Sequence, residues 1–110
     1  MGIDYQVHRA SVDIAKAFRQ FQKADNALAK DHTDSAVRHL EKGLDLFDTA
    51  MNHLAKAEDE AYEKAGKEID KGNKELQKSI DEYSNGNVDS AAKHYADAVE
   101  NYDDALDLLG

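Results

Sequence analysis

The two 55-residue halves of this chain match each other in pattern, which strongly constrains the fold. Shifting the sequence against itself by 55 positions aligns the two copies without a gap, and together they account for all 110 residues. Self-similarity at a fixed spacing indicates one supersecondary unit used twice. We therefore predict a single domain over 1–110, with one repeat over 1–55 and the other over 56–110. The matched positions include Gln22 with Gln77, Asp34-Ser35-Ala36 with Asp89-Ser90-Ala91, His39 with His94, and Leu54 with Leu109.

Each copy contains two segments with helical periodicity. Apolar residues recur at alternating steps of four and three, which is the spacing of one face of an α-helix. The chain has no proline, and it is rich in alanine, leucine, lysine and glutamate, all of which favour helices. The pattern predicts an all-α fold, an antiparallel four-helix bundle built from two tandem 55-residue helical hairpins. The four stripes cover residues 3–28, 37–54, 62–83 and 92–109.

A second stripe, made of small residues, predicts how the helices of each hairpin face each other. Ala10, Ala17 and Ala24 recur every seven residues in the first segment. Small residues let two helices approach at the close end of the usual range of about 8–10 Å. Antiparallel pairing then predicts the contacts Ala10 with Ala50, Ala17 with Gly43, Ala24 with Ala36, Ala65 with Ala105, Gly72 with Ala98, and Ser79 with Ala91.

The helix boundaries follow from breaks in the stripes. Turns are predicted at 31–33 and 84–87, with Asp34 and Asp89 as N-caps that accept the first free backbone amides. The boundary between the second and third segments is open to two interpretations. The change from basic to acidic residues over 53–60 is typical of one helix ending and another beginning. A continuous helix from about 34 to about 85 would instead force a swapped dimer.

Charge and composition exclude several classes of function. The net charge of −9 disfavours nucleic acid and anionic membranes as partners. There is no cysteine, no secretion signal and no apolar run near the roughly 20 residues that a membrane span needs, so we expect a cytoplasmic protein. No nucleophile elbow, zinc-protease motif or phosphate-binding loop is present. We therefore expect a protein that is not an enzyme and carries no cofactor.

One segment of each copy resembles a known repeat family. The stretch from Asn85 to Val99 is similar to the turn and second helix of a tetratricopeptide repeat, and Asp34 to Leu44 echoes it. In that family, paired helices pack through small residues and stacked repeats bind peptides. The period differs, because tetratricopeptide units repeat every 34 residues or so and these copies every 55. The resemblance therefore implies shared hairpin packing and transfers no functional residue.

The last helical segment carries a candidate partner-binding surface. Residues 56–110 hold seven basic and fifteen acidic residues, and no basic residue follows Lys93. Carboxylates near a helix C-terminus oppose the helix dipole, so their concentration there suggests a basic partner or a cation, although a solvated face that confers solubility is the more ordinary interpretation. Tyrosines, which are common at interfaces, accompany them; we expect these rings at the rim of the core with their hydroxyls outward. The predicted surface comprises Asp97, Glu100, Asp104, Asp107, Tyr95 and Tyr102.

The histidines suggest a second kind of site. Glu-x-x-His, the signature of di-iron bundles, is absent. The antiparallel pairing nevertheless places His8 opposite His53, with Asp4 one turn away, and imidazoles with a carboxylate can hold a divalent transition metal. Exposed histidines without a ligand would have the same spacing. His39 and His94 lie beside the small-residue stripe, where we expect packing or hydrogen bonding.

Two functions therefore stand as hypotheses. The first is a non-enzymatic helical module for protein–protein interaction or self-assembly, with a protein partner or a second copy of the chain in a homodimer. The alternative is a metal- or small-ligand-binding four-helix bundle.

Overall fold

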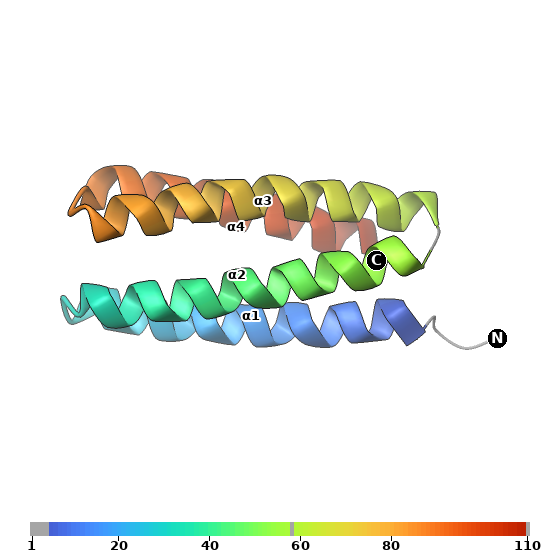
Figure 1. Ribbon diagram of the computed structural model, residues 1–110, viewed down its shortest axis with the longest axis horizontal. Coiled ribbons are helices and arrows are strands. Elements are labelled where there is room, and N and C mark those ends of the chain that lie inside the picture. Colours follow the sequence, from blue (N-terminus) through green and yellow to red (C-terminus); the bar gives the residue numbers. More distant parts are fainter. Residues whose placement is uncertain (1–4, 58, 110) are drawn as a thin grey trace.

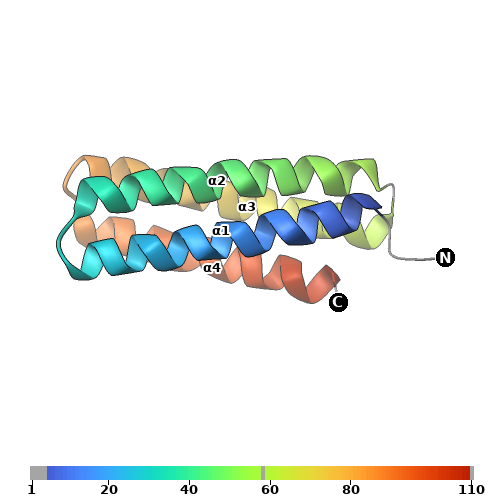
Figure 2. The same ribbon diagram turned by 90° about the horizontal axis from the view of Figure 1, so that it is seen from below.

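The computed structural model describes residues 5–57 and 59–109, which form an antiparallel four-helix bundle (Figure 1). The described residues contain four α-helices and no strand: α1 (Tyr5–Ala29), α2 (Thr33–Lys56), α3 (Glu60–Ser84) and α4 (Val88–Leu109). The bundle is a rod with Cα extents of 48 × 19 × 18 Å. The turns between α1 and α2 and between α3 and α4 lie at one end, and the α2–α3 link lies at the other (Figures 1 and 2). No helix in the described part of the chain is long and apolar enough to cross a membrane.

The turns at the two hairpin tips have the same design. Asp31 in the first copy and Gly86 in the second occupy equivalent positions, and both adopt left-handed backbone, with φ of 60° and 83°. In each tip the next residue's amide reaches back to a carbonyl five residues earlier, from His32 to Ala27 and from Asn87 to Glu82, both at 2.8 Å. Such bonds satisfy carbonyls that would otherwise be left free where a helix ends. The sequence duplication is thus a duplication of local structure.

The helix boundaries correct two expectations. Asp34 and Asp89 are not N-caps, because α2 begins at Thr33 and α4 at Val88, which puts both carboxylates inside the first turn. A negative charge there still favours the helix dipole. The continuous-helix alternative is also wrong: α2 ends at Lys56, and Asp59 caps α3 by accepting a hydrogen bond of 2.9 Å from the Ala61 amide. The two hairpins therefore fold against each other within one chain, through contacts between α2 and α3.

The small-residue stripes lie where the hairpin helices meet. Direct helix contacts join α1 to α2, α3 to α4 and α2 to α3. Ser79 Oγ donates to the Ala91 carbonyl at 2.8 Å, which confirms the predicted pairing at that level. Close approach through small residues on both sides explains why each hairpin is tight. The stripe residues other than glycine are fully buried: Ala10, Ala17, Ala24, Ala36, Ala50, Ala65, Ser79, Ala91, Ala98 and Ala105.

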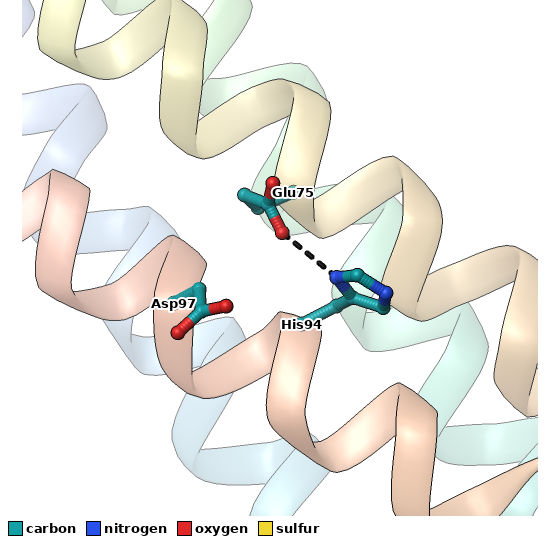
Figure 3. Close-up of side chains that lie close together, drawn as sticks. All are labelled: Glu75, His94 and Asp97. Carbon is teal, nitrogen blue, oxygen red and sulfur yellow. Dashed lines mark hydrogen bonds and ion pairs between the residues drawn. The ribbon is translucent and has the colours of Figure 1, made fainter.

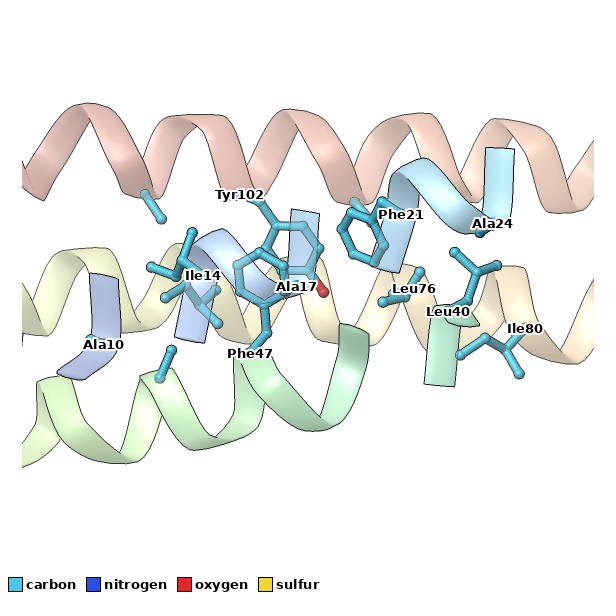
Figure 4. Packing of buried hydrophobic residues seen from close by; sticks show 14 of the residues in the cluster. Ala10, Ile14, Ala17, Phe21, Ala24, Leu40, Phe47, Leu76, Ile80 and Tyr102 are labelled. Atoms are coloured by element: carbon cyan, nitrogen blue, oxygen red, sulfur yellow. The ribbon is translucent and has the colours of Figure 1, made fainter. Parts of the chain in front are cut away.

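The centre of the core is a group of aromatic rings (Figure 4). Phe47 of α2 and Tyr102 of α4, which are equivalent in the repeat, stack with ring centroids 3.6 Å apart and planes 3° apart. Phe21 of α1 packs beside them, with its centroid 5.8 Å from each. Aromatic rings bury more apolar area than other side chains and add specific stacking contacts. The rings therefore join helices from both hairpins.

Candidate functional site

Two histidines at equivalent positions make equivalent hydrogen bonds to the neighbouring helix. In the first copy His39 Nδ1 lies 2.9 Å from Gln20 Oε1, and in the second His94 Nδ1 lies 2.8 Å from Glu75 Oε2. Gln20 and Glu75 also match in the repeat. The expected hydrogen-bonding role of His39 and His94 is confirmed. The two bonds differ in charge, because a carboxylate replaces the amide in the second copy.

The charges around these two histidines have opposite signs. Burial and the nearby Lys42, Lys23 and Arg38 lower the pKa of His39. In the second copy the hydrogen bond from His94, together with Lys78, holds the pKa of Glu75 below its ordinary value although burial opposes it. Glu75 is therefore an ionised carboxylate bound to an imidazole.

Asp97 brings a second carboxylate to this position. One ligand atom each from Glu75, His94 and Asp97 lies within 4.8 Å of the other two, and no other such group of three occurs in residues 5–57 and 59–109. Figure 3 shows the three side chains converging between α3 and α4. The sequence prediction included Asp97 in a partner-binding surface but did not include Glu75 or His94. The antiparallel pairing could have found them, since it places Glu75 beside His94.

The histidines predicted to bind metal are arranged differently. His8 is exposed on α1, and His53 of α2 turns its Nδ1 to Gln6 Oε1 at 2.7 Å. His53 Nε2 lies 3.7 Å from Asp13 Oδ2. No hydrogen bond or ion pair joins His8 to His53 in the described ranges, and Asp4 lies outside the described residues. The structure thus pairs His53 with Asp13, a residue that the sequence patterns did not single out.

Asp13 is an unusual carboxylate for its position on α1. Its carboxylate lies beside His53 of α2, and only 8% of the residue is exposed. Within the described part of the chain, its Oδ2 is buried and has no hydrogen-bond partner. A buried polar group is costly unless it is paired, and the imidazole of His53, 3.7 Å away, is the ion-pair partner that the structure places beside it.

The two tyrosines predicted on the surface point inward. Tyr102 is fully buried, so its expected position at the rim of the core is wrong and the ring cannot contribute to a binding surface in this conformation. Tyr95 is partly buried, and its hydroxyl donates to the Phe21 carbonyl of α1 at 3.4 Å. Burial raises the pKa of both phenols, and the charge of Asp48 (for Tyr102) or Asp25 (for Tyr95) adds to the effect. Both are therefore neutral hydrogen-bond donors at physiological pH.

A polar chain explains how the core accepts Tyr102. Its hydroxyl donates to Asn73 Oδ1 at 2.7 Å, and Asn73 Nδ2 donates to Asp48 Oδ1 at 2.8 Å. The chain runs from α4 through α3 to α2. Buried polar groups are tolerated when each finds a partner. Asn73 of α3 supplies the hydrogen-bond acceptor for the Tyr102 hydroxyl. The sequence-based prediction of an outward hydroxyl had assigned this role to water.

The predicted acidic residues form an exposed face on α4. Glu100, Asp104 and Asp107 are exposed, and spacings of three and four place them on one side of the helix. Leu108, 40% exposed, follows Asp104 by one turn. In the described residues no lysine or arginine pairs with these carboxylates. By contrast, lysine–carboxylate pairs occur along α3: Lys67 with Glu63, Lys71 with Glu68, Lys74 with Asp70, and Lys78 with Glu75.

An open groove lies where α2 ends and α3 begins. It has a volume of about 780 Å³, and its apolar lining comes from Met51, Leu54 and Tyr62. Gly66 has no side chain to fill the groove, and charged residues such as Asp59 also line it. Nothing in the described chain occupies this groove.

Comparisons with protein-family models, with curated proteins and with solved structures gave no match to this chain. The resemblance to tetratricopeptide hairpins therefore rests on the sequence segments alone.

Proposed function

We propose that this chain is a non-enzymatic helical protein-binding module that recognises a basic protein surface. Its recognition surface would be the acidic face of α4, defined as Glu100, Asp104 and Asp107 with Leu108 beside them. The observation that carries the proposal is the contrast between α3 and α4: the lysine–carboxylate pairs lie on α3, whereas this face has no basic counterpart among the described residues.

The position of these carboxylates supports recognition. Asp107 lies in the last turn of α4, where the helix dipole is negative and an acidic residue costs about 0.3–1 kcal/mol at low salt. A basic partner would relieve this repulsion. Leu108 would add apolar contact, which exposed ion pairs need because surface salt bridges contribute only about 0–1 kcal/mol each.

The same charge argues against self-association through this face. Two copies would bring like charges together, and juxtaposed like charges disfavour an interface. The core residues are also satisfied within one chain, since Ile14, Leu40, Phe47 and Leu76 are at most 2% exposed. A different protein is therefore the partner that the charges favour.

The test is a capture experiment with a charge-reversed triple variant, Glu100→Lys, Asp104→Lys, Asp107→Lys. Proteins retained by the wild-type chain from lysate of its source organism are identified, and the main one is titrated by calorimetry at low and at high salt. We expect binding to weaken with salt, because screening shortens the range of surface charges, and to be lost in the triple variant.

A matched control changes the same amount of charge on α3. Glu63→Lys, Asp70→Lys, Asp81→Lys alters three carboxylates that already make ion pairs or hydrogen bonds within α3. Circular dichroism must show unchanged helicity for both variants. Retained binding in the α4 variant, or equal loss in both variants, would refute recognition by the acidic face. A mass above 12.2 kDa for the isolated chain by light scattering would instead favour self-assembly.

A further inference from the structure

We propose that Glu75, His94 and Asp97 bind one divalent transition metal ion, such as zinc, between α3 and α4. This site is separate from the acidic face of α4, which lies further along the helix. It also differs from the predicted site at His8 and His53. The three residues are the only group of its kind in the described ranges, with one ligand atom each within 4.8 Å of the others.

The geometry requires little movement. Around a tetrahedral zinc ion with ligands at about 2.0–2.2 Å, neighbouring ligand atoms are roughly 3.3 Å apart. Glu75 Oε2 and His94 Nδ1 already lie 2.8 Å apart, so an ion would take the place of the proton between them. Asp97 is three positions after His94 and therefore on the same face of α4, so a change of rotamer closes the third side. Water would complete the coordination.

The donor atoms select the class of metal. One imidazole nitrogen and two carboxylate oxygens suit zinc, cobalt or nickel, whereas calcium and magnesium prefer oxygen ligands only. The two carboxylates together carry two negative charges, which balance the charge of a divalent ion. Lys78 does not block the site, because it approaches Glu75 Oε1 at 3.4 Å and leaves Oε2 facing His94.

The first repeat provides an internal comparison. The residues equivalent to Glu75, His94 and Asp97 are Gln20, His39 and Lys42. The histidine hydrogen bond has almost the same length in both copies, so hairpin packing requires neither carboxylate. The first copy carries an amide and a cation where the second carries two anions. Among the described residues, only the second copy therefore gathers three potential metal ligands.

The comparison also supplies a conservative test variant. Glu75→Gln recreates the pair that Gln20 forms with His39, so the fold and the histidine hydrogen bond should persist while one ligand is lost. Zinc chloride is titrated into the wild-type chain and the variant by calorimetry, and histidine ring resonances are followed by NMR. We expect one saturable zinc ion in the wild type, with shifts at His94 and none at His39. Affinity should fall by more than the roughly 10–100-fold that loss of an outer-shell partner alone costs.

A gain-of-site variant makes the test independent of any loss of folding. Gln20→Glu with Lys42→Asp installs the second copy's ligands around His39, and we expect a second equivalent of bound zinc. No saturable binding to the wild type, unchanged affinity in Glu75→Gln, or shifts centred on His8 or His53 would each overturn the proposal. The charge-reversed α4 variant leaves all three ligands in place. Its zinc binding should match the wild type whether or not it captures a protein.

Discussion

Replacing Gly72 with alanine should destabilise the bundle, although alanine is the better helix former. A Cβ at this position would lie 2.5 Å from Tyr102 Cε1 and 2.7 Å from its Cδ1. Carbon atoms pack at about 3.5–4.0 Å, so the ring would have to move by about 1 Å. The ring is held on its other side by Phe47, 3.6 Å away, and at its hydroxyl by Asn73, 2.7 Å away. The movement would disturb both contacts.

The expected magnitude is a balance of two effects. Alanine in place of glycine inside a helix stabilises by about 0.8–1.0 kcal/mol. Overpacking a well-filled core costs about 1–3 kcal/mol, and occasionally more. Because this ring has a neighbour on its far side, we expect the upper part of that range and a net loss of about 1–2 kcal/mol. In a chain of this length, that corresponds to a fall in Tm of roughly 4 °C for each kcal/mol.

Two other glycines provide the comparison. Gly43 has a similar problem with Phe21, whose Cε1 would lie at 2.5 Å, but its next contacts are longer, at 3.0 and 3.3 Å. Gly66 meets only Met51 Cγ at 4.0 Å, so Gly66→Ala should stabilise by up to about 1 kcal/mol. Urea unfolding followed by circular dichroism should rank the variants, from least to most stable, as Gly72→Ala, Gly43→Ala and Gly66→Ala. If Gly72→Ala matches or exceeds the wild type, the rings do not hold each other in place as described.

Three further predictions concern polar groups in or beside the core. Burial, followed by the charge of a neighbouring aspartate, raises the pKa of Asp48, so the native state holds its proton to higher pH and stability falls as pH rises from about 4 toward neutral. Asp48→Asn should remove this dependence in pH-dependent urea unfolding and stabilise slightly at pH 7, by less than about 0.5 kcal/mol; an unchanged pH profile would contradict it. Tyr102→Phe leaves the Asn73 oxygen without its donor and should cost about 1–3 kcal/mol in thermal unfolding, whereas a neutral result would mean that water reaches Asn73. Ser79→Ala removes a single hydrogen bond to the Ala91 carbonyl and should cost about 0.5–1.5 kcal/mol by urea unfolding; a larger loss would mean that the hydroxyl also sets the spacing of the helices.

Local patterns determined most of the fold. Helical periodicity and the small-residue stripe each depend on residues within one hairpin, so the four helices and the contact of Ser79 with Ala91 could be predicted. The N-caps were misplaced because several polar residues near a helix start can satisfy its free amides, and the choice among them depends on backbone geometry at the turn. The α2–α3 break was ambiguous for a related reason, since neither glycine nor proline marks it.

The packing of one hairpin on the other determined what periodicity could not show. The repeat places Tyr102 at the position equivalent to Phe47. The burial of Tyr102 depends on a hydrogen-bond acceptor from a different helix, Asn73 of α3. The approach of Asp13 to His53 likewise depends on side-chain directions across two helices. For the candidate metal site, the repeat and the antiparallel pairing placed Glu75 beside His94, but only the folded hairpin brought Asp97 within reach of both. Periodicity specifies which face of a helix is buried, whereas the partner of each polar atom is decided when the faces meet.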